Sequence, residues 1–351
     1  MSRPPLFPQE DPIRSLAVVM LSVSDRCGGR CRMCDIWKPR GGGPNGRAAA
    51  DLDLDLLVGW LPGWRALGVR RVGLTGGDPL VHEEIDRLLG SLGDAGFRLT
   101  LMTAGTGLVD HTPAVARRCD SVVVSLDGPP EVHDAIRRTP GSFAEMRSGI
   151  EAVRERAGEA IRITARCTVQ DANVGHLVAT VETARGMELD GISLLPVDAS
   201  RTAFGRTGAD SEESLRRRLC PAAGDLDTLA AELEAVADGA GSGGEPDFVA
   251  EDRRALRTRV LDHFRAEAGL IGHRARPCNA PWVSAVVEID GTVRPCFFHE
   301  PSGRAGPLDD LGAVLNADPA LEQRSRLDVA NDPICRRCVC PLALRVGEAP
   351  E

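Results

Sequence analysis

The chain has no tyrosine and only eight phenylalanines among its 351 residues. It therefore offers few aromatic platforms on which the bases of a single-stranded nucleic acid could stack. Its formal net charge is −9, whereas proteins that bind phosphate backbones normally carry a basic patch. Both features argue against a nucleic-acid partner, and the negative charge is compatible with a cationic substrate.

Long apolar runs are also missing. No stretch approaches the roughly 18 consecutive apolar residues that a membrane-spanning helix needs. The N-terminal sequence MSRPPLFP lacks the regions of a secretory signal peptide. We therefore expect a cytoplasmic protein that does not contact a membrane. Eleven cysteines in such a chain indicate metal ligands rather than disulfides.

Three of these cysteines, Cys27, Cys31 and Cys34, stand close together in the sequence CGGRCRMC. Because of this spacing, one loop can present three thiolates to a single inorganic centre. A [4Fe–4S] cluster held by three thiolates keeps one iron free for a non-protein ligand. Zinc is the alternative, but a structural zinc site is normally closed by four ligands, and the nearest histidine is the distant His82. We therefore place the iron–sulfur interpretation first.

Two later segments have the composition of a strand that ends in a turn, GGDP at 76–79 and SLDG at 125–128. Together with the cysteine triplet they resemble, in family order, the landmark motifs of radical S-adenosylmethionine (radical SAM) enzymes. The resemblance implies that S-adenosylmethionine chelates the open iron through its amino and carboxylate groups. It also implies that one electron, supplied from outside by a flavodoxin or ferredoxin, cleaves the sulfonium and releases a 5′-deoxyadenosyl radical.

Residues of both segments are expected to bind the cofactor. Gly76 and Gly77 let the backbone come close to a ligand, so that their carbonyls can accept from the methionine ammonium, and Asp78 follows them directly. Ser125 and Asp127 end a strand, where polar groups can reach the methionine or ribose portion of the cofactor.

The chain departs from the family pattern at two places. The residue before the third cysteine, often aromatic in this family, is Met33, a flexible apolar group that can still cover an adenine ring. The third strand ends in MTAGT at 102–106, where many relatives have Thr-Asn-Gly. Both changes concern cofactor contacts and leave the cluster ligands unchanged.

Apolar runs alternate with helical stretches in the first two hundred residues. Strands are predicted at 16–23, 69–74, 99–103, 121–125, 161–169 and 191–196, and helices near 52–67, 83–95, 143–156 and 174–186. This alternation is typical of a parallel sheet. It matches the partial (β/α)6 barrel that the resemblance implies, an α/β fold whose site lies at the carboxyl ends of the strands.

The predicted strand at 161–169 has two chemically different faces, because side chains alternate along a strand. One face holds Cys167 and its apolar neighbours and should pack on helices. The other holds Thr164, Arg166 and Thr168 and should line the barrel. We therefore expect Arg166 and Thr168 to touch the cofactor or substrate.

A second group of cysteines stands in the C-terminal segment. Cys278 precedes and Cys296 follows a predicted β-hairpin with an Asp-Gly turn, and Cys335 and Cys338 form a Cys-x-x-Cys pair. Taken alone, the two pairs fit a zinc ribbon as well as an iron–sulfur site. Behind a radical SAM barrel they resemble the twitch domain, the shortened form of the SPASM extension. The resemblance implies that these four cysteines hold one auxiliary [4Fe–4S] cluster.

Four regions are therefore predicted along the chain. They are an N-terminal tail at 1–15, the partial barrel at 16–222, a helical linker region at 223–275 and the auxiliary-cluster domain at 276–351.

An auxiliary cluster closed by four protein ligands cannot bind substrate directly and is best suited to relay electrons. Twitch-domain relatives dehydrogenate or epimerise aminocyclitols and sugars, which implies chemistry at a carbinol carbon. After hydrogen is removed from this carbon, loss of a proton and an electron gives a ketone, whereas a hydrogen atom from a thiol on the opposite face inverts the centre. We place epimerisation of a carbohydrate or aminocyclitol in antibiotic biosynthesis first, and dehydrogenation second.

Four cysteines remain as candidate hydrogen donors. Cys119 is most simply a core residue, and Cys167 faces the helices unless a bulge changes the register. Cys220 lies in an irregular segment that could cap the barrel. Cys340 lies beside the auxiliary cysteines and could even replace Cys338 as a ligand. The candidate donors are thus Cys220, Cys340 and Cys167, and the sequence does not choose securely among them.

A ribosomally made peptide is the alternative substrate class. Many SPASM and twitch proteins modify such peptides and carry a leader-binding element before the cysteine motif. Only 26 residues precede Cys27 here, and they are rich in proline, which favours a small molecule. A protein that only transfers electrons through clusters would leave the two cofactor motifs unexplained.

Overall fold

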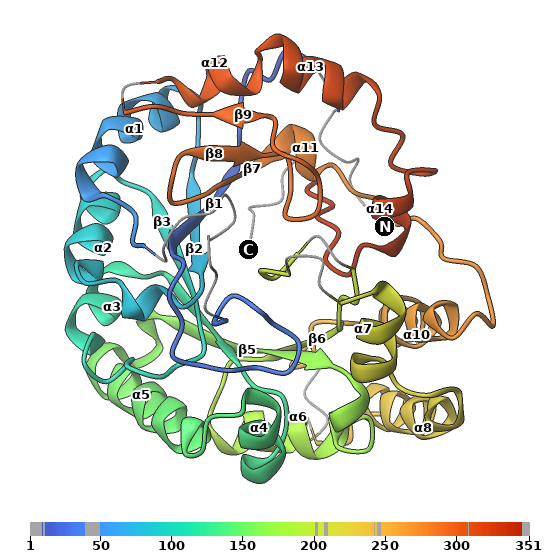
Figure 1. Cartoon of the computed structure of the whole chain (residues 1–351). Helices are drawn as coiled ribbons and strands as arrows, with labels where there is room; N and C mark the ends of the chain where they lie inside the picture. The colour runs from blue at the N-terminus through green and yellow to red at the C-terminus, as the bar shows by residue number, and fades with distance from the viewer. Residues whose placement is uncertain are drawn as a thin grey trace.

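The computed structural model describes residues 9, 11–38, 50–200, 203–206, 210–241, 243, 247–307 and 309–345. In this part of the chain, one sheet has the strand order β6-β5-β4-β3-β2-β1-β7-β8-β9 (Figure 1). The sheet curves around a central space, with helices along its outer side.

The first six strands form the partial barrel. They are β1 (Val18–Ser24), β2 (Arg71–Gly76), β3 (Arg98–Thr103), β4 (Ser121–Ser125), β5 (Arg162–Val169) and β6 (Ile192–Pro196). Each of the strands β1 to β5 pairs in parallel with the next strand along the chain. The predicted α/β fold with six parallel strands is confirmed.

Helices cover the outer side of these strands. They are α1 (Leu54–Ala66), α2 (Ile85–Asp94), α3 (Thr112–Arg118), α4 (Pro130–Arg137), α5 (Ser142–Ala157) and α6 (Leu177–Gly186), with short helical turns at η1 (Pro79–Val81), η2 (Gly158–Ala160) and η3 (Asp171–Asn173). In α2 the fully buried Ile85, Leu88, Leu89 and Leu92 have the spacing of an amphipathic helix. The short helices α3 and α4 are not among the predicted helices.

The alternation along β5 follows the sequence prediction. Thr164, Arg166 and Thr168 are partly exposed toward the barrel lumen, whereas Ala165 and Cys167 are buried. The barrel lumen and the helix-facing core are therefore lined by opposite faces of the same strand.

The C-terminal residues extend the same sheet. β7 (Ser284–Val287) pairs in parallel with β1, and β8 (Thr292–Arg294) and β9 (Gly303–Arg304) continue it in antiparallel fashion. The predicted hairpin is present, but the sheet continues across the predicted boundary at residue 276, and Val287 and Val293 belong to the main apolar core. The reason is that β1 would otherwise leave an unpaired sheet edge.

Further helices lie beside β6 and around the C-terminal strands (Figure 1). They are α7 (Glu212–Leu219), η4 (Ala223–Asp225), α8 (Leu226–Ala237), α9 (Arg253–Ala255), the π-helical turn η5 (Leu256–Leu261), α10 (Asp262–Glu267), α11 (Ala280–Val283), α12 (Leu311–Leu315), α13 (Asp318–Ser325) and α14 (Pro333–Arg337). Among the helices of the described residues, none has both the length and the apolar content for crossing a bilayer.

Candidate active site

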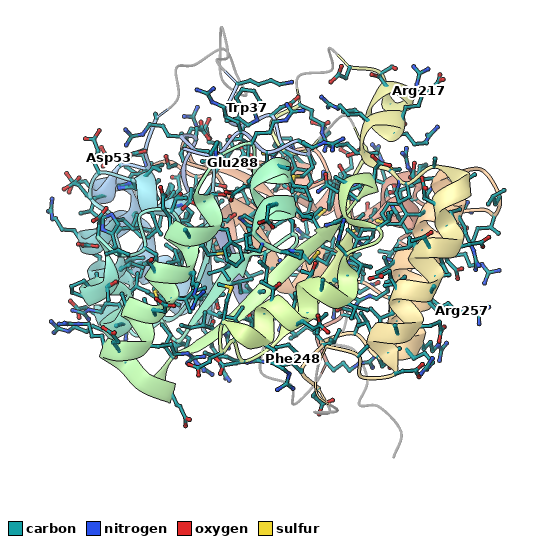
Figure 2. The ribbon with its side chains drawn as sticks, turned by 90° about the horizontal axis from the view of Figure 1, so that it is seen from below. Trp37, Asp53, Arg217, Phe248, Arg257 and Glu288 are labelled. Atoms are coloured by element: carbon teal, nitrogen blue, oxygen red, sulfur yellow. The ribbon has the colours of Figure 1, made fainter. Side chains whose placement is uncertain are left out.

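The cysteine loop follows β1 and lies at the carboxyl ends of the barrel strands. Trp37 closes this loop by donating from Nε1 to the carbonyl of Cys34 at 2.7 Å. At the other end of the barrel, the carbonyl of Phe248 accepts from the backbone N–H of Ile192, where β6 begins, at 2.8 Å. Figure 2 shows Trp37 and Phe248 on opposite sides of the molecule. The loop therefore occupies the end at which α/β barrels carry their sites.

The three thiols of this loop converge on one space. A Cβ atom on Gly29 would lie 3.7 Å from the sulfur of Cys27 and 3.5 Å from that of Cys31. Burial, and to a smaller extent the negative charges of Asp78, Cys31 and Cys34, raise the pKa of Cys27 to about 12. Glycine at position 29 leaves this space open, and three sulfurs around it fit a cluster with one iron free for another ligand.

Gly76 and Gly77 hold the start of the cysteine loop. The N–H of Gly77 donates to the carbonyl of Ser24 at 2.6 Å, and the N–H of Asp78 to that of Arg26 at 2.9 Å. A Cβ on either glycine would overlap one of these two carbonyls, and Gly76 also has a φ of +134°. The structure therefore shows a role of the glycines in addition to the expected one, because the lack of a side chain lets the main chain at Ser24 and Arg26 approach them closely. Contact of their carbonyls with the cofactor stays a prediction.

Replacing Gly77 by Ala should displace the cysteine loop, because the new Cβ meets backbone and not a flexible side chain. We expect 5′-deoxyadenosine formation to fall by about 10²-fold, the effect of misplacing a reacting group by roughly 1 Å. Gly90→Ala in α2 is the matched control, since its Cβ meets nothing within 4 Å. Equal rates for the two variants, measured by chromatography of 5′-deoxyadenosine, would disprove this role of Gly77.

Asp78 is occupied within the protein. Its buried carboxylate accepts from Thr103 Oγ1 at 2.9 Å, from the N–H of Ala104 at 2.8 Å and from the N–H of Leu80 at 3.0 Å. It thus ties the end of β2 to the end of β3. Donors to both carboxylate oxygens give Asp78 a positioning role, and its expected direct contact with the cofactor stays a prediction.

Asp127 is likewise directed inward. One carboxylate oxygen accepts from the N–H of Thr168 at 2.9 Å, and the other forms an ion pair with Arg137 at 2.7 Å. A second nitrogen of Arg137 donates to the sulfur of Cys31 at 3.6 Å. Asp127 therefore reaches the cluster site through Arg137, and its expected contact with the cofactor stays a prediction. Sequence reasoning missed Arg137, whose only signal is its place at the end of a short helix behind the SLDG segment.

Arg166 and Ser125 lie side by side on neighbouring strands, β5 and β4. Arg166 interacts electrostatically with Cys340 and Glu251. Its buried Nε has no hydrogen-bond partner among the described residues. Burial is the main cause that lowers the pKa of Arg166. A guanidinium placed in this way can bind an oxygen atom of a ligand in the lumen.

Residues 203–206 cross the cysteine loop. Arg206 donates to the carbonyl of Met33 at 2.7 Å and pairs with Asp198 at 2.7 Å, and the N–H of Asp35 donates to the carbonyl of Phe204 at 2.8 Å. The Phe204 ring lies 6.4 Å from that of Phe298, near the auxiliary cysteines. This segment therefore connects the two cysteine groups.

The four predicted auxiliary cysteines also converge. The thiols of Cys278 and Cys296 both interact electrostatically with that of Cys338, and Cys335 interacts with Cys278 and Cys296. Cys340 instead hydrogen-bonds to Cys338 through its thiol and interacts electrostatically with Arg166. These contacts support Cys338 rather than Cys340 as the fourth ligand. Four sulfurs around one point fit a cluster without an open iron.

The remaining four cysteines differ in their exposure to solvent. Cys167 is fully buried on the helix-facing side of β5 and accepts from Asn173 Nδ2 at 3.6 Å, while Cys119 and Cys220 are buried in the main apolar core. Cys340 is exposed. Cys167 and Cys220 are thus less exposed than Cys340, and which thiol donates hydrogen stays a prediction.

Comparison with known proteins identifies two domains. Residues 21–182 match the radical SAM superfamily, and residues 278–339 match SPASM, an iron–sulfur cluster-binding domain. The second match decides the alternative left open for the auxiliary cysteines in favour of iron and sulfur over zinc.

Similar curated proteins include GTP 3′,8-cyclases. That of Rhizobium etli is 33% identical over 210 residues, which cover 56% of this chain and 58% of that protein. GTP 3′,8-cyclase 1 of Pseudomonas aeruginosa is 27% identical over 334 residues, which cover 89% of this chain and 92% of that protein. The chain thus spans little more than half of the Rhizobium relative. These names differ from the expected epimerases and dehydrogenases, whose specific resemblance stays a prediction.

Solved structures share the fold. Streptococcus suis SuiB bound to S-adenosylmethionine has a TM-score of 0.65 at 15% identity, covering 93% of this chain and 72% of that one. The protein anSMEcpe with bound AdoMet has a TM-score of 0.61 at 15% identity, covering 92% and 86%. The two family matches show that the chain contains a radical SAM domain followed by an iron–sulfur cluster-binding SPASM domain, and its cofactors are S-adenosylmethionine and two [4Fe–4S] clusters.

Proposed function

We propose that the chain is a radical SAM enzyme that epimerises a carbinol centre of a carbohydrate or aminocyclitol. The position of Cys340 carries this proposal. Among the four thiols outside the two cysteine groups, it is the exposed one, and it interacts with Arg166 on the lumen face of β5. A thiol at this position is what inversion requires and what dehydrogenation does not.

S-adenosylmethionine, when bound, supplies the carbon radical that removes a hydrogen atom from the substrate. Cys340 then gives the hydrogen atom of its S–H bond to the opposite face of the substrate carbon, so that a C–H bond forms and the sulfur keeps the unpaired electron. One electron and one proton restore the thiol. The contact between Cys340 and Cys338 gives that electron a short path from the auxiliary cysteines, and an external flavodoxin or ferredoxin supplies the reducing equivalents.

Arg166 and Glu251 provide the polar contacts of this proposed substrate site. Arg166 can donate to a substrate oxygen beside Cys340. Glu251 is buried, its carboxylate accepts from the N–H of Leu194 at 2.8 Å, and burial raises its pKa. Arg166 and Glu251 interact electrostatically with each other, and one donor with one acceptor can orient a hydroxylated ring.

Cys340→Ala should abolish inversion while 5′-deoxyadenosine is still made, because the variant lacks the thiol and keeps all seven predicted ligands. In D2O the wild-type product should contain one deuterium at the inverted carbon, since a thiol exchanges its proton with water. Mass spectrometry and NMR of the product measure both effects. Candidate substrates are compounds whose biosynthesis genes neighbour the gene of this protein.

Cys220→Ala is the matched control, since it removes a thiol that the core encloses. This variant should epimerise at the wild-type rate. Normal inversion by Cys340→Ala would contradict the proposal. So would a wild-type product two mass units lighter than the substrate, because that product is the ketone of a dehydrogenase.

Cyclisation of a nucleotide is the second candidate function. Two observations favour it, the names of the curated relatives and a cavity of about 1210 Å³ beside Glu251 that is lined by arginines, including Arg259 and Arg276. Incubation with GTP tests it. Consumption of GTP that depends on S-adenosylmethionine and falls in Arg259→Gln, but not in Arg257→Gln on the same turn (Figure 2), would favour the cyclase.

A further inference from the structure

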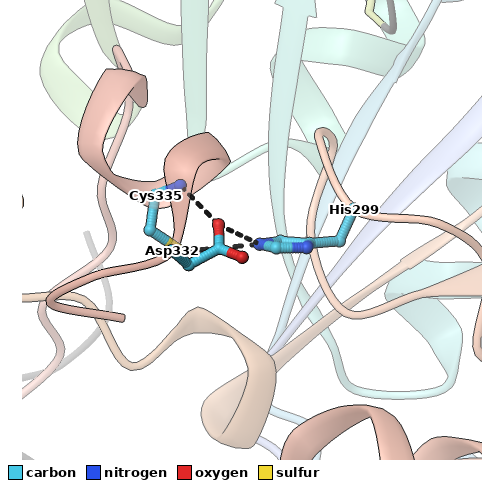
Figure 3. A group of neighbouring side chains, drawn as sticks. All are labelled: His299, Asp332 and Cys335. Atoms are coloured by element: carbon cyan, nitrogen blue, oxygen red, sulfur yellow. Dashed lines mark hydrogen bonds and ion pairs between the residues drawn. The ribbon is translucent and has the colours of Figure 1, made fainter. Parts of the chain in front are cut away.

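His299 lies between two groups that accept hydrogen bonds at the auxiliary site (Figure 3). Its Nε2 is 3.4 Å from the sulfur of Cys335 and 3.8 Å from a carboxylate oxygen of Asp332. A ligating thiolate and a carboxylate both only accept hydrogen bonds. Nε2 therefore carries the proton and donates toward the sulfur.

The backbone around His299 is held in place. Its carbonyl accepts from Arg294 Nη1 at 3.0 Å, and Arg294 pairs with Glu288 at 2.6 Å. The backbone N–H groups of Phe298 and His299 donate to the sulfur of Cys296. Through its backbone and its ring, one buried residue thus contacts sulfurs from both the hairpin and the Cys-x-x-Cys segment.

Asp332 has the opposite effect from His299 on negative charge at the Cys335 sulfur. Its carboxylate accepts from the N–H groups of Ile334 and Cys335, both at 2.9 Å, and so caps α14. An oxygen of the same carboxylate lies within 4.8 Å of the Cys335 sulfur, so that its negative charge is close to this ligand. The carboxylate therefore opposes negative charge on this ligand, and the ring N–H of His299 offsets it.

The other auxiliary sulfurs receive hydrogen bonds from the main chain. Cys278 accepts from the N–H groups of Ala280 and Leu342, and Cys338 from the N–H of Cys340. At Cys335 the donor is a side chain, so substitution can remove it without changing the backbone. The effect of this contact on the cluster can therefore be measured in a variant that keeps the fold.

We propose that His299 is a positioning residue of the auxiliary centre whose Nε2–H hydrogen bond to Cys335 raises the reduction potential of the cluster bound there. The physical reason is that a reduced cluster carries one more negative charge, which a donor at a ligand sulfur stabilises. Asp332 lowers the same potential. The pair sets the electron affinity of the centre, whichever substrate the enzyme uses.

Potentiometric titration followed by electron paramagnetic resonance tests this in the full-length, anaerobically reconstituted protein. His299→Leu removes the donor and should make one-electron reduction of the auxiliary cluster about tenfold less favourable, a shift of about 59 mV to more negative potential. His299→Gln keeps an N–H near the position of Nε2 and should restore most of the shift. Asp332→Asn keeps the cap but loses the charge, and should move the potential in the positive direction.

His111→Leu is the control, because His111 pairs with Asp86 on the barrel surface and should leave the potential unchanged. An unchanged potential in His299→Leu with full iron content would overturn the proposal. So would loss of the auxiliary iron from both His299 variants, since that result indicates a ligand or a purely structural residue. A negative shift in Asp332→Asn would equally contradict the opposing roles of the two side chains.

Discussion

Replacing Cys27, Cys31 and Cys34 together by Ala should remove about half of the iron and abolish 5′-deoxyadenosine formation. Two [4Fe–4S] clusters correspond to about eight irons per chain after anaerobic reconstitution, and this loop holds one of them. The sulfurs of Cys27 and Cys31 face the space beside Gly29, and the Cys27 thiol interacts electrostatically with that of Cys34. The variant therefore has none of the three predicted ligands. Iron analysis and chromatography of the nucleoside measure the two losses.

The reciprocal variant, with Cys335 and Cys338 replaced by Ala, is the control. It should also lose about half of the iron, but it should still cleave S-adenosylmethionine, because the N-terminal thiols are intact. Cleavage by the triple variant would refute our assignment of the N-terminal site. Equal loss of cleavage in both variants would show that the two groups do not bind separate clusters.

Arg137→Leu should lower the stability of the protein by about 3–5 kcal/mol, the typical effect of breaking a buried ion pair. Asp127 is fully buried, and Arg137 is its charge partner at 2.7 Å, so the variant leaves a carboxylate without compensation. The expected decrease in melting temperature is roughly 5–10 °C. Differential scanning calorimetry under anaerobic conditions measures it.

Arg147→Leu is the matched control. Arg147 pairs with Glu151 on the surface of α5 at 2.8 Å, and both side chains are more than half exposed, so its loss should change stability by less than about 0.5 kcal/mol. The loss of stability in Arg137→Lys should lie between those of the two leucine variants. Lysine keeps the positive charge but lacks the forked guanidinium group that reaches both Asp127 and Cys31. An Arg137→Leu protein as stable as the Arg147→Leu protein would rule out the structural importance of this pair.

Much of the fold was predictable because it depends on local order in the sequence. The alternation of strands and helices specified the parallel sheet, and the two-residue period of β5 correctly placed Cys167 on the buried face and Arg166 toward the lumen. The spacing of Cys27, Cys31 and Cys34 predicts the cluster loop, because ligands separated by a few residues need no tertiary information to converge. These features depend on the periodicity of side chains along an element and on the short sequence distance between ligands.

The roles of single residues depended on contacts between distant segments. Arg137 contacts the sulfur of Cys31, from which it is separated by 106 positions in the sequence. No local sequence pattern predicts such a contact. Asp78 and Asp127 are predicted cofactor contacts because they end strands, and only the tertiary packing shows that both are buried and have partners within the protein. Gly77 is predicted to let the backbone approach a ligand. The structure shows that its missing side chain also makes room for the backbone carbonyl of Arg26.

The sequence by itself determined which cysteines belong to which group, and the domain matches agree with that division. Only the tertiary structure distinguished the remaining thiols, because Cys220 is enclosed by the core and Cys340 is exposed. It also showed that β7 pairs with β1 and brings the auxiliary cysteines beside the barrel. The physical reason is that burial and strand pairing result from the packing of the whole chain, whereas spacing and periodicity are properties of short segments.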